Sequence, residues 1–292
     1  MLAHPTHERL IALGLPGMAK AFEEQRRSPD VAALSFEERL GLMVDREAAE
    51  RDTRRLAVRL KFASLRQNAV VEDVDLRTSR GIDRALFQKL VAGDWIDRAE
   101  GLLITGPTGI GKSWIACALG HKACRDGRSV LYHRAPRLFE ALALARGDGR
   151  YARLLKSLAR VQLLILDDWG LSVLTETEQR DLLEIVEDRH QRASTIVTSQ
   201  LPVDQWCDVF GNPTLADAIL DRLVHNAHRL TITGESMREG LSERRRLALR
   251  RAVRTSQSSR RRLRGRLTRV RNAMRRGWDG GRFRLRKANP SD

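Results

Sequence analysis

The stretch Gly106-Pro-Thr-Gly-Ile-Gly-Lys-Ser113 decides the fold of this chain. It fills every fixed position of the pattern G-x-x-x-x-G-K-[S/T]. The apolar residues 101–105 before it predict a short buried strand, and residues 114–119 after it predict a largely buried helix. A strand, a glycine loop and a helix in this order form a phosphate site, because loop N–H groups and the helix N-terminus attract anionic oxygens.

This motif assigns a role to each of its polar side chains. Lys112 is expected to reach the β- and γ-phosphates of a nucleotide, and the Ser113 hydroxyl to ligate Mg²⁺. We therefore expect ATP and Mg²⁺ as cofactors. The residues predicted to surround the nucleotide are Gly106, Pro107, Thr108, Gly109, Ile110, Gly111, Lys112, Ser113 and Trp114.

Beyond this loop, apolar strand patterns alternate with helical ones. The further strands are expected at 129–132, 161–166, 194–198 and 229–233. The run 161–166 is almost continuously apolar, which is typical of a strand buried on both faces of a parallel sheet. The chain therefore predicts an α/β fold of the P-loop NTPase type, a doubly wound parallel sheet with its ligand at the carboxyl ends of the strands.

Two adjacent acids, Asp167 and Asp168, follow the run 161–166. We interpret Asp167 as the Walker B acid that holds Mg²⁺, and Asp168 as the residue that orients or deprotonates the attacking water. A helix cap is the structural alternative for this pair. Aspartate is one methylene shorter than glutamate, so the reach of Asp168 depends on an ordered water.

Polar and basic residues further along are candidates for the remaining catalytic roles. Ser199 and Gln200 end the strand 194–198, where a polar side chain either bonds the γ-phosphate or simply terminates the strand. No arginine lies inside the phosphate loop, so catalytic positive charge must come from elsewhere. Arg222 is a candidate finger for a neighbouring subunit's nucleotide, or else pairs with Asp221. Arg238 is a candidate γ-phosphate contact in the same subunit.

Residues 1–67 are expected to form a helical N-terminal domain, in which Ser35 and Glu38 make a capping box. The basic residues of its long helix are either part of a solvated face or a stripe that meets a phosphate backbone. They are Arg51, Arg54, Arg55, Arg59 and Lys61. Trp95, just before the first strand, is expected to plug the core.

The 292 residues carry 53 Lys+Arg against 37 Asp+Glu, a net charge of +16. Residues 240–292 hold 19 of the basic residues and three acidic ones, so the first 239 residues are balanced. We see no signal peptide and no run of roughly 20 apolar residues. Three cysteines without metal-ligand spacing favour a reducing compartment, so a cytoplasmic location without membrane association is expected.

Several longer motifs resemble the IstB-like family of AAA+ ATPases, which are helpers of insertion-sequence transposition and are similar to DnaC-type helicase loaders. The residues that carry the resemblance are LGLPGMAKAFEEQ at 13–25, LLITGPTGIGKSWIACALG at 102–120, LLILDDWG at 163–170, TIVTSQLPVDQW at 195–206, NPTLADAILDRLVHNAHRL at 212–230 and GESMR at 234–238. The resemblance covers about residues 5–238.

The resemblance implies an AAA+ core at 68–239 that forms homo-oligomers with ATP on duplex DNA and delivers target DNA to the transposase of the same element. It would make Ser199 the sensor residue and Arg222 the trans finger, and it favours DNA contact by the N-terminal basic stripe. A helicase loader and a nucleotide-gated DNA-binding scaffold with little hydrolysis remain alternatives.

The tail, residues 240–292, departs from the family pattern, because family members usually stop soon after GESMR. Its 18 arginines and one lysine are consistent with out-of-frame read-through. They are also consistent with a disordered basic arm that binds nucleic acid nonspecifically, in which each neutralised phosphate steepens the log–log salt dependence by about 0.9.

Overall fold

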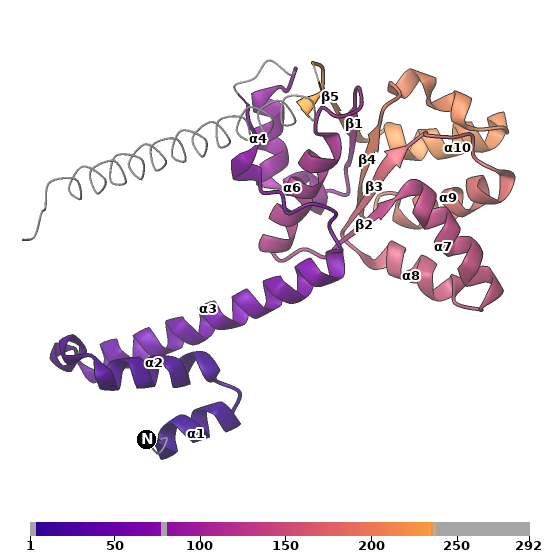
Figure 1. Ribbon diagram of the computed structural model, residues 1–292. Coiled ribbons are helices and arrows are strands. Elements are labelled where there is room, and N and C mark those ends of the chain that lie inside the picture. The colour runs from indigo at the N-terminus through magenta and orange to yellow at the C-terminus, as the bar shows by residue number, and fades with distance from the viewer. Residues whose placement is uncertain (1–3, 77–80, 235, 238–292) are drawn as a thin grey trace, which may run out of the picture. The chain divides into compact units, whose positions relative to one another are not determined.

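The computed structural model describes residues 4–76, 81–234, 236 and 237 (Figure 1). The chain divides into two compact units, 1–235 and 236–292. Every helix and strand of the described residues belongs to the first unit. Arg238 and the arginine-rich tail lie outside the described residues.

A five-stranded parallel sheet forms the centre of the nucleotide-binding region. Its strands are β1 (Gly101–Thr105), β2 (Val130–Arg134), β3 (Leu163–Trp169), β4 (Ser194–Ser199) and β5 (Ala227–Thr231). Their order in the sheet is β2-β3-β4-β1-β5. The predicted doubly wound parallel fold is confirmed, and the carboxyl ends of β1, β3 and β4 lie side by side. The last strand begins at Ala227, two residues before the predicted start.

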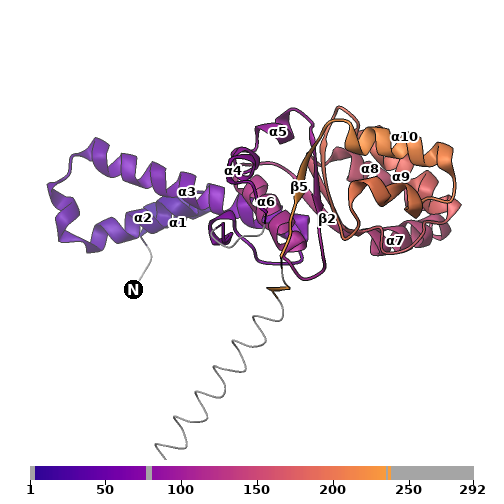
Figure 2. The same ribbon diagram turned by 90° about the horizontal axis from the view of Figure 1, so that it is seen from above.

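Helices cover both faces of this sheet, as Figures 1 and 2 show. One face carries α4 (Arg84–Ala92), the short α5 (Asp94–Asp97) and α6 (Lys112–Arg125). The other carries α7 (Ala135–Gly147), α8 (Tyr151–Arg160), α9 (Glu176–Arg189), η3 (Val203–Val209) and α10 (Pro213–Val224). Because both faces are covered, the inner strands β1 and β3 contain nearly continuous apolar runs without alternation. Helix α4 begins at Arg84, because the Asp83 side chain caps it by accepting from the Ala85 and Leu86 N–H groups.

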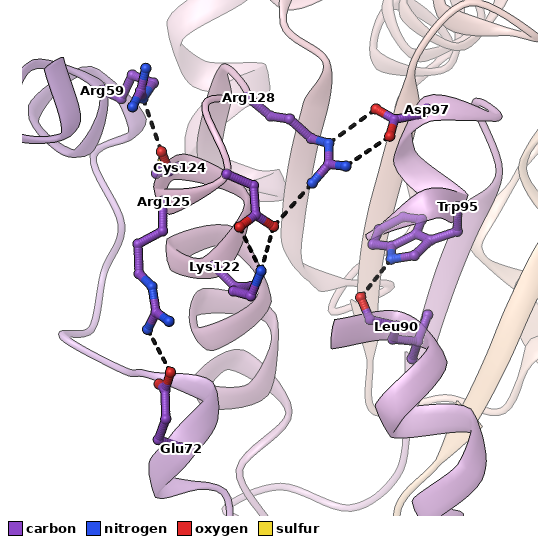
Figure 3. Close-up of polar contacts among 10 residues, drawn as sticks. Arg59, Glu72, Leu90, Trp95, Asp97, Lys122, Cys124, Arg125 and Arg128 are labelled. Atoms are coloured by element: carbon purple, nitrogen blue, oxygen red, sulfur yellow. Dashed lines mark hydrogen bonds and ion pairs between the residues drawn. The ribbon is translucent and has the colours of Figure 1, made fainter. Parts of the chain in front are cut away.

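Trp95 is fully buried between these layers, as predicted. Its indole N–H donates to the Leu90 carbonyl at 2.9 Å, which closes the connection between α4 and α5 (Figure 3). Cys117 and Cys124, both on α6, are likewise buried in the core. No helix among the described residues is long and apolar enough to cross a membrane.

The N-terminal residues form α1 (Pro5–Ala12), α2 (Pro16–Arg27), η1 (Pro29–Ala33) and α3 (Phe36–Ala63). The predicted capping box at Ser35 and Glu38 opens α3. Gly17 lets α2 pack closely on α3, since a Cβ there would lie 2.6 Å from the Glu47 Cα.

Glu47 of α3 is buried and caps the first turn of α2. Its Oε2 accepts from the Gly17 N–H at 2.7 Å and the Met18 N–H at 3.2 Å, and Oε1 accepts from Arg51 at 2.8 Å. Burial opposes ionisation, but these hydrogen bonds prevail and hold the pKa of Glu47 below its usual value of 4.5. The ionised carboxylate therefore fastens α2 to α3 more strongly than the neutral acid would.

We expect Glu47→Gln to destabilise the packing of α2 against α3 at pH 7. A group with a depressed folded pKa contributes stability above its unfolded pKa and loses it as the pH falls through the folded value. The difference in melting temperature between parent and variant should therefore be constant near neutrality and shrink below about pH 4.5. Thermal unfolding at several pH values measures it, with Glu140→Gln at an exposed α7 position as control. An unchanged difference at pH 3 would contradict the assignment.

Candidate nucleotide site

The loop between β1 and α6 has the backbone conformation that its glycines predict. Gly106, Gly109 and Gly111 have φ angles of 141°, 82° and 100°, all in the region that favours glycine. A Cβ on Gly106 would lie 2.1 Å from the Ile232 carbonyl oxygen. The loop therefore depends on glycine both for its conformation and for its close approach to the chain after β5.

Lys112 opens α6, and its ammonium group lies over the loop. Nζ donates to the carbonyl oxygens of Gly106 and Pro107, each at 2.7 Å. The side chain is mostly buried, and these two hydrogen bonds hold its positive charge against the loop. Phosphate oxygens are the natural partners of an ammonium group held in this way.

Asp167, near the end of β3, is fully buried beneath this loop. Its Oδ1 accepts from the Ser113 hydroxyl at 2.6 Å and the Thr198 hydroxyl at 2.5 Å, and its Oδ2 accepts from Tyr132 at 2.5 Å. Burial and the neighbouring carboxylate raise the pKa of Tyr132, so its phenol remains a donor. Three hydroxyl donors thus orient a buried carboxylate directly beside Ser113.

The donor set at this point fits Mg²⁺. A hydroxyl and a carboxylate from the protein, completed by substrate phosphates and water, are what Mg²⁺ usually takes. In the described part of the chain no three His, Cys, Asp or Glu side chains gather into a metal cage, and Mg²⁺ held through a nucleotide needs none. Ser113 and Asp167 are therefore the residues that would hold it.

Asp168 points to different partners from its neighbour. Its φ is +61°, and β3 has an irregular register against β4 at this point. Its Oδ2 accepts from Arg134 Nε at 2.7 Å and lies 3.5 Å from Arg66 Nη1. The positive φ of Asp168 thus gives the two acids different hydrogen-bond donors, while Arg66 Nη1 lies near both carboxylates, 3.6 Å from Asp167 Oδ2 and 3.5 Å from Asp168 Oδ2.

Comparison with known proteins identifies the chain. The family model described as IstB-like ATP binding protein matches residues 8–245. A Sinorhizobium fredii protein, y4pL, whose name describes an insertion sequence ATP-binding protein, is 64% identical over 238 residues, which are 82% of this chain and 97% of that protein. A Pseudomonas aeruginosa protein named for ATP binding and for insertion sequence IS21 is 35% identical over 205 residues, 70% of this chain and 77% of that one.

The chain belongs to the IstB-like ATP-binding family. Its fold is shared with solved AAA+ structures. The crystal structure of DnaI aligns with a TM-score of 0.51 at 22% identity, over 57% of this chain and 92% of that one. The replication initiator DnaA bound to AMPPCP and single-stranded DNA aligns with a TM-score of 0.50 at 19% identity, over 59% and 52%.

Ser199, for which the resemblance implies a sensor role, lies at the end of β4 with its hydroxyl hydrogen-bonded to the backbone. Ser199 Oγ donates to the Trp169 carbonyl at 3.0 Å and accepts from the Leu201 N–H at 3.1 Å. The preceding residue, Thr198, is the one that reaches the acids. Its hydroxyl bonds Asp167 and accepts from the Asp168 N–H at 3.2 Å.

Arg222 lies in the last turn of α10, far from the loop of its own subunit. It donates to the Ala218 carbonyl at 2.7 Å and to Glu187 of α9 at 2.9 Å, so its ion pair is not the one with Asp221 considered from the sequence. It borders a cavity of about 450 Å³ whose lining includes Gly101 and Thr195, the residues at the amino ends of β1 and β4. The phosphate loop follows the opposite end of β1, five residues away or roughly 16 Å.

Sequence patterns missed four side chains that surround the acid pair, namely Arg66, Tyr132, Arg134 and Thr198. Thr198 and Arg134 lie at or near the carboxyl ends of strands next to β3, and Tyr132 lies in the middle of β2. These positions could have been found once the strand order was known. Arg66 carries no such signal, because it precedes the first strand by many residues.

The N-terminal basic stripe is largely paired within the protein. Arg51 and Arg54 contact Glu47, Arg55 contacts Asp52 at 3.6 Å, and Arg59 donates to the Cys124 carbonyl at 2.9 Å. These contacts fit the solvated-face interpretation for part of the stripe. The guanidinium groups of Arg54 and Arg55 remain more than half exposed.

Proposed function

We propose that this protein is an ATP-hydrolysing, DNA-binding helper of transposition, which assembles as a homo-oligomer on duplex DNA with ATP and presents target DNA to the transposase of its own element. In this proposal, residues 1–67 form a helical N-terminal domain, residues 68–239 the ATPase domain and residues 240–292 a basic tail. A cytoplasmic location follows from the need to reach DNA.

A single observation carries the enzymatic part of the proposal. The Ser113 hydroxyl and the Asp167 carboxylate meet at 2.6 Å directly below a loop in the phosphate-binding conformation. Ser113 and Asp167 would hold Mg²⁺, which would supply positive charge to neutralise the charge that develops on the phosphates. A glycine turn with no role in nucleotide binding would not need a fully buried carboxylate hydrogen-bonded to the first turn of the helix that follows it.

The remaining side chains divide the work of hydrolysis between subunits. Lys112 binds the β- and γ-phosphates, and Asp168, once freed from its arginine partners, orients or deprotonates the attacking water. Ser199 acts as sensor through its position at the end of β4. Arg222 supplies positive charge to the nucleotide of a neighbouring subunit, because the phosphate loop of its own subunit lies at the opposite ends of the strands. Arg238, outside the described residues, is a further γ-phosphate candidate.

The transposition role is supported by the relatives. Proteins named for insertion sequences match this chain over almost their whole length. The replication proteins that share the fold are below 25% identity, so a helicase-loader role has weaker support. An element's ATP-binding protein implies the DNA and the transposase of that element as partners.

A nucleotide-gated DNA-binding scaffold is a second candidate, and one contact favours it. Asp168 is bonded to Arg134 at 2.7 Å and lies close to Arg66, so the residue expected to activate water is occupied. If those contacts persist with ATP, the nucleotide would hold subunits together without efficient hydrolysis.

ATP turnover with and without duplex DNA separates the two candidates. We expect duplex DNA to raise the turnover of the parent, and Asp168→Ala to lower the stimulated rate by about 10²-fold, the usual contribution of a general base. Asp148→Ala, at a loop position away from the site, serves as control. A parent rate that stays at background with DNA would favour the scaffold.

A further inference from the structure

Arg66 reaches the acid pair from outside the ATPase core. Its Nη1 lies 3.6 Å from Asp167 Oδ2 and 3.5 Å from Asp168 Oδ2. An arginine side chain is always protonated in proteins, so the guanidinium is charged. One cation therefore lies beside both acids, including the one that would ligate Mg²⁺.

The backbone of Arg66 is fixed by the junction between α3 and α6. Ser64 ends α3 in the left-handed conformation, with φ 50° and ψ 38°, which turns the chain sharply between Ala63 and Leu65. Ala63 is fully buried, and a Cβ on Gly120 of α6 would lie only 3.2 Å from Leu65 Cδ2. Arg66, whose side chain contacts the acids, thus follows closely after the last turn of α3 in the chain.

Two polar contacts hold this junction on α6, as Figure 3 shows. Arg59 of α3 donates to the Cys124 carbonyl at 2.9 Å, and Arg125 bonds Glu72 of η2 (Val71–Asp73) at 2.7 Å. A cavity of about 240 Å³, lined in part by Leu60, Leu65 and His121, lies between the end of α3 and α6. The junction is therefore anchored at a few points and has room for the last turn to shift.

The positive charge of Arg66 opposes the binding of Mg²⁺ at Asp167. A cation beside Asp167 stabilises the carboxylate before Mg²⁺ arrives, but it repels a divalent cation at the same carboxylate. The Arg66 side chain is 41% exposed, so the guanidinium can move towards solvent without disrupting the core.

We propose that Arg66 is a positioning residue that competes with Mg²⁺ for the acid pair and so couples metal occupancy to the last turn of α3. The inference rests on the proposed function, in that Mg²⁺ and ATP bind at Ser113 and Asp167. Because such coupling is reciprocal, whatever moves the end of α3 changes the affinity for Mg²⁺, and Mg²⁺ with ATP changes the end of α3.

Two measurements on the full chain test this coupling. The first is the Mg²⁺ concentration that half-saturates binding of a slowly hydrolysed ATP analogue. Arg66→Ala should lower it by about fivefold, a modest effect because the group is partly exposed to solvent. Arg66→Lys keeps the charge and should stay near the parent, and Arg39→Ala, at an exposed α3 position outside the basic stripe, should equal the parent.

The second measurement is amide hydrogen exchange at residues 56–65 with and without Mg²⁺ and the analogue. We expect the parent to show a change there on binding, and Arg66→Ala to lose that change. Circular dichroism confirms that each variant is folded, and Arg66→Gln provides a second neutral side chain should alanine not fold.

Either of two results would overturn the inference. One is an unchanged or higher Mg²⁺ requirement in a folded neutral variant, as a merely structural role predicts, and the other is an exchange response that persists without Arg66. In both cases the parent still binds the analogue with Mg²⁺ and the proposed function stands. A parent that binds no ATP at any Mg²⁺ concentration would overturn the proposed function and this inference with it.

Discussion

Replacing Arg222 with alanine is expected to lower the ATP turnover of the assembled protein by at least about 10³-fold and to leave nucleotide binding unchanged, because a trans arginine finger acts on transition-state charge. The expectation follows from position. Arg222 lies at the amino edge of the sheet with Ala218 and Glu187 as its partners, at the other end of β1 from its own phosphate loop. It can therefore act only on a nucleotide bound by another subunit.

Mixed assemblies provide the decisive measurement. Lys112→Ala subunits have a defective phosphate loop but an intact Arg222, whereas Arg222→Ala subunits have the converse. Turnover should reappear when the two inactive variants are mixed on duplex DNA with ATP. Arg180→Ala, at an exposed α9 residue paired with Glu176, controls for loss of a surface charge. Mixtures that stay inactive, or Arg222→Ala protein that turns over ATP at the parent rate, would exclude the trans role.

The part of the site that lies in continuous sequence could be predicted. The loop Gly106–Ser113 and the acids after an apolar run are local patterns, since glycine positions and strand composition depend on near neighbours. Strand number and parallel direction followed from the same runs, and the capping box at Ser35 is present as expected. The ends of some strands lie two or three residues from their predicted positions, because pairing with neighbouring strands determines where each strand begins and ends.

The partners of the acids could not be predicted, because they depend on which strands become neighbours. Thr198 and Tyr132 reach Asp167 only because β3 lies between β2 and β4 in the sheet. The different hydrogen-bond donors of Asp167 and Asp168 depend on one positive φ angle, at Asp168, which its residue type does not predict. Arg66 is harder still, since only the packing of α3 on α6 brings it to the site.

Asp167→Asn is expected to lower ATP turnover by roughly 10³-fold, since loss of a metal ligand costs more than the 10–100-fold of an outer partner. The amide is neutral and nearly the same size, so it removes the charge that attracts Mg²⁺ but keeps the shape of the buried site. The hydroxyls of Ser113, Thr198 and Tyr132 can rotate to accept from the new NH₂ group as well as donate to its oxygen. The loss should therefore appear in Mg²⁺-dependent nucleotide binding much more than in the melting temperature.

Asp181→Asn is the matched control for this substitution. Asp181 is also a buried carboxylate, and it accepts from the Tyr151 hydroxyl at 2.6 Å and from Arg146, but it belongs to α9 and contacts no part of the phosphate loop. Titration of ATP with Mg²⁺ into both variants distinguishes loss of a carboxylate that binds Mg²⁺ from loss of a carboxylate that only stabilises the core. Equal losses of Mg²⁺-dependent binding in the two variants, or parent-like binding by Asp167→Asn, would mean that Asp167 acts only as a structural acceptor and that Mg²⁺ is held elsewhere.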